Sequence, residues 1–355
     1  MPVNISQLLE KVLILNASDL HLSVGVSPAV RINRILSYLT DFSPMSIEDI
    51  EYVLTQILSK DQKDLLDVNR EIDFSVALGN KARFRVNAFY QKGYPSIAMR
   101  YLPMIVPTIE DLGLPPIFAS LAELDNGLVL VTGPTGMGKS TAIAAIIERI
   151  NQTRADHIIT IEDPIEHIFT NKKSLIEQRE MYLDTHSWDI SLKSVLRQDP
   201  DVVVIGEMRD YETISSAITI AETGHLVIST LHTNSAAQTI DRIVDSFPEE
   251  KQKQVRVQLS QILEAVISMR LLPSPSKGVV PAVEILIGNS AVRSMIREGK
   301  THQIDNVIAT SSNFGMTSLE TSLAELVSKG DIEVSDALRV ASRPEELRRL
   351  LKGVN

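Results

Sequence analysis

The sequence predicts an α/β fold, in which a parallel sheet covered by helices follows a smaller α+β domain. Short, continuously apolar and β-branched segments alternate with helical stretches after the first hundred residues, as buried parallel strands do. The segment GPTGMGKST (133–141) joins one such strand to a helix and fits the glycine-rich pattern G-x-x-x-x-G-K-[ST]. The first hundred residues differ, because their apolar residues follow amphipathic helical spacing or strict alternation.

An N-terminal domain is predicted over residues 1–101. Helical spacing of apolar residues predicts a helix over 4–15, and a serine cap followed by acidic residues predicts another over 46–58. Segments of alternating polarity predict strands, and the last three are expected to pair in antiparallel order. These segments are 19–24, 28–33, 71–78, 82–91 and 95–102.

Residues 102–118 are predicted to form a linker to the second domain. The segment contains four prolines, and proline lacks the backbone N–H that a helix interior or a central strand needs. The second domain is therefore expected over 119–355. Its buried strands and main helices are predicted at 127–133, 157–163, 201–207 and 225–230, and at 139–150 and 209–224.

The glycine-rich loop has the chemistry of a nucleotide-binding site. Glycines let successive backbone N–H groups turn inward around phosphates, and the following helix N-terminus adds a favourable potential. Lys139 is expected to reach the β and γ phosphates, Ser140 to coordinate Mg²⁺, and Thr141 to lie near the α phosphate. The predicted nucleotide contacts in the loop are Gly133, Pro134, Thr135, Gly136, Met137, Gly138, Lys139, Ser140 and Thr141.

Acidic residues stand at the ends of two predicted strands, where α/β sheets bind their ligands. Glu162 and Asp163 end one strand and are expected beside the nucleotide, and Glu166 follows in the same segment. Glu207 ends another strand and is suited to holding the Mg²⁺ shell. Any one of these acids could instead cap a helix or remain solvated, but their occurrence together with the phosphate loop favours a catalytic site.

The composition argues against several other classes of protein. The absence of cysteine excludes disulfides and thiolate zinc sites. A formal net charge of -10 without a basic run argues against a nucleic-acid partner. The apolar runs are far shorter than the ~20 residues of a membrane helix, and the N-terminal segment does not resemble a secretory signal. A cytoplasmic location is expected.

Two histidines flank an apolar segment in AETGHLVISTLHTN (221–234). On one extended strand, His225 and His232 would lie roughly 23 Å apart and face opposite sides, so they could not share a metal ion. His232 is expected at the phosphate end of the sheet, where an imidazole can donate to a γ phosphate. Packing or capping remains an alternative for either histidine, more so for His225.

The assembled motifs resemble those of the type II/IV secretion ATPase superfamily, and within it the retraction ATPases of type IV pili (PilT-like). The resemblance covers nearly the whole chain and implies a RecA-like P-loop ATPase core, a PAS-like N-terminal α+β domain and a hexameric ring. Besides the phosphate loop, it includes ASDLHLSVG (17–25), the Asp box ITIEDPIEH (159–167), the Walker B segment LRQDPDVVVIGEMRD (196–210) and the His box over 221–248.

The resemblance also implies roles for individual residues. Glu166 would be the general base for the attacking water, with Glu162 and Asp163 of the same box as alternatives. Glu207, in place of the commoner aspartate, would support Mg²⁺ and water. His225 and His232 would sense the nucleotide and couple it to movement.

Arginines of the N-terminal domain would complete ATP sites between subunits of the ring, and Arg83 and Arg100 fit that pattern. Arg83 and Arg85 lie on one strand face, where a role in solubility is the alternative for either residue. The ligands implied are ATP and Mg²⁺. The partners implied are a homo-hexamer and an inner-membrane pilus platform protein, with a peripheral location at that membrane.

The implied function is ATP-driven retraction of type IV pili. Relatives in pilus assembly and type II secretion usually carry a four-cysteine zinc insertion, whereas this chain has no cysteine. The stretch AVRSMIREGK (291–300) keeps Ala291 and Arg293 of the retraction group's AIRNL-type motif and replaces three of its five positions. The alternatives are an accessory retraction paralogue, an assembly or secretion ATPase, a nucleic-acid translocase and a non-catalytic nucleotide switch.

Overall fold

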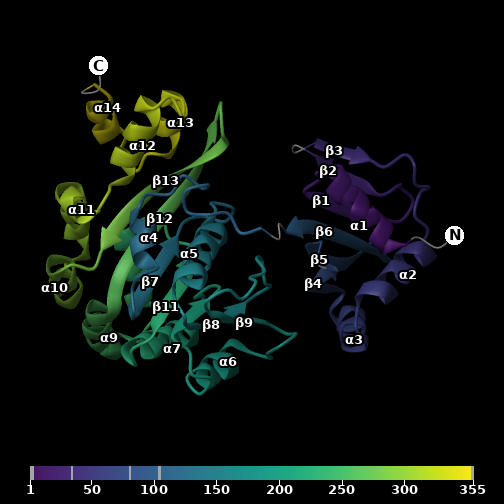
Figure 1. Cartoon of the computed structure of the whole chain (residues 1–355), viewed down its shortest axis with the longest axis horizontal. Coiled ribbons are helices and arrows are strands. Elements are labelled where there is room, and N and C mark those ends of the chain that lie inside the picture. Colours follow the sequence, from purple (N-terminus) through teal and green to yellow (C-terminus); the bar gives the residue numbers. More distant parts are fainter. Residues whose placement is uncertain (1–3, 33–34, 80, 103–104, 353–355) are drawn as a thin grey trace. The chain divides into compact units, whose positions relative to one another are not determined.

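The chain forms two compact units (Figure 1). The first comprises Met1–Ile105 and Pro164–Ile168, and the second comprises Val106–Asp163 and Phe169–Asn355. The computed structural model describes residues 4–32, 35–79, 81–102 and 105–352. Within these ranges, every helix is too short or too polar to cross a membrane.

The first unit is an antiparallel sheet with helices packed on one face. Its neighbouring strands pair in the order β3-β2-β1-β6-β5-β4. Its described elements are α1 (Ile5–Ile14), β1 (Asp19–Ser23), β2 (Ala29–Ile32), β3 (Ile35–Tyr38), α2 (Ile47–Ile57), α3 (Lys60–Asn69), β4 (Glu71–Leu78), β5 (Ala82–Gln91) and β6 (Tyr94–Leu102). The predicted helices and antiparallel strands are confirmed.

Two elements of the first unit lack the pattern that predicts the others. All four residues of β3 are exposed, and its sequence ILSY does not alternate apolar and polar residues. The helix α3 buries only Leu66 and begins at the capping box of Ser59 and Gln62 rather than at an apolar repeat.

Side chains of strand β5 alternate between the buried face of the first unit's sheet and its opposite face. Phe84 and Val86 are buried in one core with Leu8 of α1 and Ile50 of α2. The intervening residues, among them Arg83 and Arg85, therefore point to the opposite face of the sheet, as the alternation predicts.

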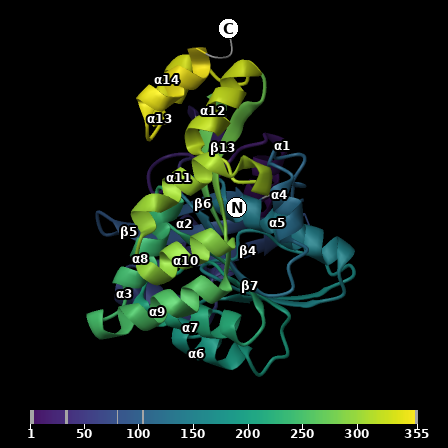
Figure 2. The same ribbon diagram turned by 90° about the vertical axis from the view of Figure 1, so that its left-hand side faces the viewer.

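The second unit is a larger sheet between two layers of helices (Figures 1 and 2). Its described elements up to the last strand are α4 (Ile117–Leu121), β7 (Gly127–Thr132), α5 (Lys139–Thr153), β8 (His157–Glu162), β9 (Leu175–Glu180), α6 (Trp188–Val195), β10 (Val202–Ile205), α7 (Tyr211–Glu222), β11 (Leu226–Leu231), α8 (Ala236–Asp245), α9 (Glu249–Ile262), β12 (Leu263–Ser274) and β13 (Gly278–Ile287). Those that follow are α10 (Ser290–Glu298), η1 (Thr301–Gln303), α11 (Ile304–Thr310), η2 (Ser312–Phe314), α12 (Leu319–Ser328), α13 (Val334–Val340) and α14 (Pro344–Lys352).

The strands of the second unit run in the order β13-β12-β7-β11-β10-β8-β9, and all pairs are parallel except that of the edge strand β13. The predicted parallel sheet is confirmed. The helices α4 and α5 cover one face, and α6 to α11 cover the other. Among the latter, α9 and α10 lie side by side in both views (Figures 1 and 2).

Part of the predicted linker, residues 102–118, packs with the second unit. Residues 103 and 104 lie outside the described residues, and the segment from Val106 onward belongs to the second unit. Ile109 and Leu114 are buried in the core beneath α5, and a reciprocal hydrogen-bond pair between Thr108 and Asp111 holds the turn. The prolines prevent a regular helix but do not prevent packing, because apolar residues stand between them.

A buried acid joins β13 to the start of α8. Glu284 is 7% exposed, and its Oε1 accepts a hydrogen bond from the Ala236 N–H at 2.7 Å. Burial raises the pKa of Glu284 to about 7, despite that hydrogen bond. The folded chain therefore binds a proton here that the unfolded chain has already lost above its ordinary pKa of 4.5.

Stability is consequently expected to fall as the pH rises from about 4.5 to 7, as Glu284 loses its proton. Glu284→Gln keeps the oxygen that accepts from Ala236 and removes the charge. We expect it to raise the melting temperature by roughly 5 °C at pH 8 and to change it little at pH 5. Thermal unfolding at both pH values measures this, and an equal shift at both would contradict it.

Candidate nucleotide-binding site

The glycine-rich loop between β7 and α5 has a backbone that needs glycine. Gly133 has a φ of 136°, and a Cβ built there would lie 2.5 Å from the carbonyl oxygen of Met269. Gly138 has a φ of 79° and begins α5 as its N-cap. The loop therefore passes directly against β12 and presents the N-terminus of α5, the geometry that binds phosphates.

Lys139 lies inside this loop. The residue is 8% exposed, and its Nζ donates to the carbonyl oxygens of Gly133 at 2.8 Å and Pro134 at 3.0 Å. Thr135, Gly136 and Ser140 are exposed, while Met137 and Thr141 are half-buried. The sulfur of Met137 accepts a hydrogen bond from the Leu271 N–H, which ties the loop to β12.

His232 connects the lysine of the loop to the acid at the end of β10. Its Nδ1 lies 3.4 Å from Lys139 Nζ, and its Nε2 lies 3.0 Å from Glu207 Oε1. An imidazole that accepts at Nδ1 and donates from Nε2 satisfies both contacts. The other oxygen of Glu207 accepts from Arg209 Nε at 2.8 Å. Lys139, His232, Glu207 and Arg209 are called the strand-end cluster from here on.

Hydroxyl groups on β11 hold the end of β10 in place. Ser229 Oγ donates to the Ile205 carbonyl at 2.8 Å, and Thr230 Oγ1 donates to the Gly206 carbonyl at 2.7 Å. These bonds fix the backbone that carries Glu207. Neither Ser229 nor Thr230 was predicted as a site residue, although two polar residues at the end of an otherwise apolar strand could have indicated their role.

Glu162 and Asp163, at the end of β8, have different surroundings. Glu162 Oε1 accepts hydrogen bonds from Thr160 Oγ1 at 2.6 Å and Gln178 Nε2 at 3.2 Å, which ties β8 to β9. The pKa of Arg209 is raised, first by its hydrogen bond to Glu207 and in smaller part by the nearby charge of Asp163. Asp163 therefore contributes to the field of the strand-end cluster, whereas Glu162 makes structural contacts.

His225 lies at the other end of β11 from His232. Its Nδ1 is 3.0 Å from the Ile220 carbonyl oxygen and 3.0 Å from Thr223 Oγ1, at the end of α7. This position corresponds to the capping alternative, and within the second unit the structure does not bring His225 to the phosphate loop. The two histidines do not form a metal pair.

Glu166 and the predicted arginines belong to the first unit. Glu166 Oε1 lies 3.8 Å from Arg85 Nη1, and both side chains are partly exposed. Arg83 donates to Ser75 Oγ, and Arg100 Nε donates to Asp19 Oδ1 at 2.9 Å. Pro164–Ile168 lies within the predicted second domain (119–355) but groups with the first unit; it follows β8, which ends at Glu162.

Arg270 on β12 is a further polar residue beside the loop. Its Nη2 donates to the carbonyl and side-chain oxygens of Asn234 at 3.1 and 3.0 Å, and its Nη1 to the Met269 carbonyl at 3.0 Å. Ser268 Oγ donates to the same Asn234 carbonyl at 3.0 Å. The segment after His232 is thus fastened to β12, a connection that the sequence did not reveal.

The stretch AVRSMIREGK includes most of α10 and is held by Arg293. The guanidinium donates to the carbonyls of Gly288, Ser260 and Gln261 and to Glu264 Oε1. Arg293 therefore fastens α10 to the end of α9 and the start of β12.

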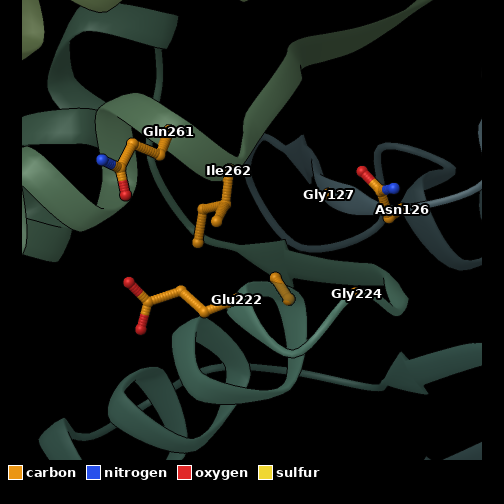
Figure 3. Close-up of a pocket in the computed structure, with 7 residues that line it drawn as sticks. Asn126, Gly127, Glu222, Gly224, Gln261 and Ile262 are labelled. Atoms are coloured by element: carbon orange, nitrogen blue, oxygen red, sulfur yellow. The ribbon is translucent and has the colours of Figure 1, made fainter.

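A cavity of about 360 Å³ lies beside the first residue of β7 (Figure 3). It opens between the start of β7, the end of α7 and the end of α9. Its lining residues include Asn126, Gly127, Glu222 and Gln261. In the described part of the chain, no group of three or more histidine or acidic side chains could hold a metal ion.

His232→Ala is expected to slow ATP hydrolysis about tenfold and to leave nucleotide affinity within about threefold. The change removes the imidazole that bridges Lys139 and Glu207 but no backbone group of the loop. Steady-state hydrolysis and fluorescent nucleotide binding measure the two effects. His225→Ala is the matched control within the second unit, and an unchanged rate for His232→Ala would assign that residue to packing.

Comparisons with known proteins agree over nearly the full chain. The family described as "Type II/IV secretion system protein" matches residues 2–333. The type IV pilus retraction ATPase PilT of Pseudomonas aeruginosa is 45% identical over 329 residues, which cover 93% of this chain and 95% of that protein. A twitching motility protein of Neisseria gonorrhoeae is 47% identical over 322 residues, covering 90% of this chain and 86% of its own length.

A solved structure agrees with these sequence matches. The crystal structure of the pilus retraction motor PilT with bound ADP superposes with a TM-score of 0.91 at 46% identity. The match covers 98% of this chain and 99% of that one. The fold is therefore that of a two-domain retraction-type ATPase.

Proposed function

Because the chain belongs to the type II/IV secretion system protein family, we propose that it is a Mg²⁺-dependent ATPase that drives type IV pilus retraction. The observation that carries the proposal is the strand-end cluster, in which His232 joins the loop lysine to Glu207 over 3.4 and 3.0 Å. The similarity to a type IV pilus retraction ATPase over 93% of the chain supports pilus retraction as the process that hydrolysis drives.

Hydrolysis rests mainly on electrostatic positioning. The loop N–H groups and Lys139 hold the β and γ phosphates, and the buried position of Lys139 strengthens its attraction to them. Glu207 orients water at the edge of the sheet, and His232 transmits the state of the γ phosphate from Lys139 to Glu207.

The oxygen donors beside the loop fit Mg²⁺. The exposed Ser140 hydroxyl stands in the first turn of α5, and the Glu207 carboxylate is 21% exposed at the end of β10. Hard oxygen ligands with room for water and phosphate suit this ion. Bound with the nucleotide, it would neutralise charge on the β and γ phosphates.

The full site is completed in a homo-hexamer. Glu166 acts as the general base, and Arg83 and Arg100 of a neighbouring subunit approach the γ phosphate. The proposal is supported by the partial exposure of the two side chains, which is 39% for Glu166 and 69% for Arg100. An inner-membrane pilus platform protein receives the movement, and the hexamer works at the cytoplasmic side of that membrane.

Deletion of the gene tests the direction of the motor. A strain that lacks a retraction ATPase keeps its pili extended, so we expect surplus surface pili and no twitching motility. Loss of surface pili would instead assign the protein to assembly. Counting sheared pilin and measuring twitching zones in the same strain gives both readouts.

One observation supports a second candidate, an accessory retraction ATPase. The stretch AVRSMIREGK departs from the AIRNL-type motif at three of five positions, although Arg293 remains. An accessory motor would leave twitching partly intact on deletion and would need a second retraction ATPase for activity in cells.

A further inference from the structure

A row of charged side chains crosses the sheet of the first unit. Strand register pairs Asp19 of β1 with Arg31 of β2 and with Arg100 of β6, and pairs Arg100 with Arg85 of β5. Residues that face each other across neighbouring strands point to the same side of a sheet. This set of four residues, the arginine row, therefore places one carboxylate among three guanidinium groups.

Asp19 is the buried member of the arginine row. Its side chain is 10% exposed, compared with 69% for Arg100 and 39% for Arg31. Its Oδ1 accepts from Arg100 Nε at 2.9 Å, and its Oδ2 accepts from Ser18 Oγ at 2.7 Å and lies 3.8 Å from Arg31 Nε. Burying a carboxylate is costly unless both oxygens are compensated, and here both are.

The protonation of Asp19 agrees with this geometry. Burial raises the pKa of the Asp19 carboxyl, but the hydrogen bonds from Ser18 and Arg100 outweigh that effect and hold the pKa below its ordinary value. Asp19 is therefore ionised at neutral pH and attracts the guanidinium that it holds.

The contact with Asp19 determines which edge of Arg100 remains available. Arg100 donates from Nε, so its two terminal nitrogens take no part in this bond, and the side chain as a whole is 69% exposed. Those nitrogens form the fork that binds a phosphate through parallel hydrogen bonds. Arg85 stands directly opposite, and this like-charged neighbour would push an untethered Arg100 aside.

We propose that Asp19 is the positioning residue that holds Arg100 by Nε and aims its terminal nitrogens at the triphosphate of the neighbouring subunit. The inference rests on the proposed function, in which Arg100 completes that subunit's site. Asp19, in the ASDLHLSVG segment, would then contribute to the hydrolytic step. If the Arg100 guanidinium is wrongly oriented, it loses its contact with the transition state even when the sheet stays folded.

Asp19→Asn in the full-length protein is the direct test. The variant keeps the shape of the side chain and removes its charge, so we expect kcat to fall about tenfold and KM for ATP to stay within about twofold. Asp41→Asn is the matched control, because it breaks an ion pair of the same unit, with Lys11 at 2.8 Å, outside the arginine row. A lower melting temperature with an unchanged kcat would show a purely structural role and overturn the proposal.

A double-mutant cycle with Arg100→Ala separates this inference from the proposed function. If Asp19 acts through Arg100, Asp19→Asn causes no further loss of kcat in the Arg100→Ala background. An equal loss in both backgrounds overturns the positioning role. A normal kcat for Arg100→Ala removes Arg100 from the proposed function and the inference with it, whereas a slow Arg100→Ala beside a normal Asp19→Asn removes the inference alone.

Discussion

Lys139→Ala protein is expected to hydrolyse ATP at least about 100-fold more slowly than the wild type. The ammonium is buried inside the phosphate loop, where its charge is poorly screened and its attraction to the γ phosphate is strong. Alanine leaves no cation at that position, and no other lysine is predicted to reach the phosphates. Phosphate release at saturating ATP measures the loss, and nucleotide affinity should fall as well.

The matched control is Lys193→Ala, which removes an exposed lysine of α6 that pairs with Asp189 at 2.7 Å. Its rate should equal that of the wild type. Hydrolysis retained by folded Lys139→Ala protein would refute the assignment of the loop as the catalytic phosphate site.

Glu166→Gln is expected to lower kcat about 100-fold or more while ATP binding is kept. Glutamine preserves the size of the side chain but cannot accept the proton of the attacking water. Single-turnover hydrolysis and equilibrium nucleotide binding separate the two effects.

Glu162→Gln distinguishes between the acids of the Asp box. Glu162 already accepts hydrogen bonds from Thr160 and Gln178, so its replacement should affect stability more than turnover. If Glu162→Gln stops turnover and Glu166→Gln does not, the general base is Glu162, and the role given to Glu166 is withdrawn.

The core of the second unit could be predicted because its central strands are recognisable from their own short apolar sequences. Both Val202–Ile205 and Leu226–Leu231 are buried on both faces. The first is entirely apolar, the second is apolar up to Ser229 and Thr230, and each ends beside polar residues that belong to the site. Edge strands carry less information: β9, with the sequence LIEQRE, is largely polar and was not predicted. β12 and β13 were not predicted either, although both contain long apolar runs.

The contacts of the site could be predicted only in part. The loop pattern specifies Lys139 locally, whereas the link from His232 to Glu207 depends on strand order, which places β11 between β7 and β10. Arg270 and Asn234 are joined by a hydrogen bond although they are 36 positions apart in the sequence, and no local pattern predicts such a contact. Proline content predicts a linker through backbone restriction, and it gives no information on the burial of Ile109 and Leu114.

Time-lapse imaging of fluorescently labelled pili tests the central claim most directly. The cells should carry this gene under an inducible promoter and no other retraction ATPase. We predict that induction of the wild type shortens existing pili, and that induction of Lys139→Ala leaves them extended. Pili that lengthen on induction of the wild type, or shorten equally with Lys139→Ala, would contradict an ATP-driven retraction motor.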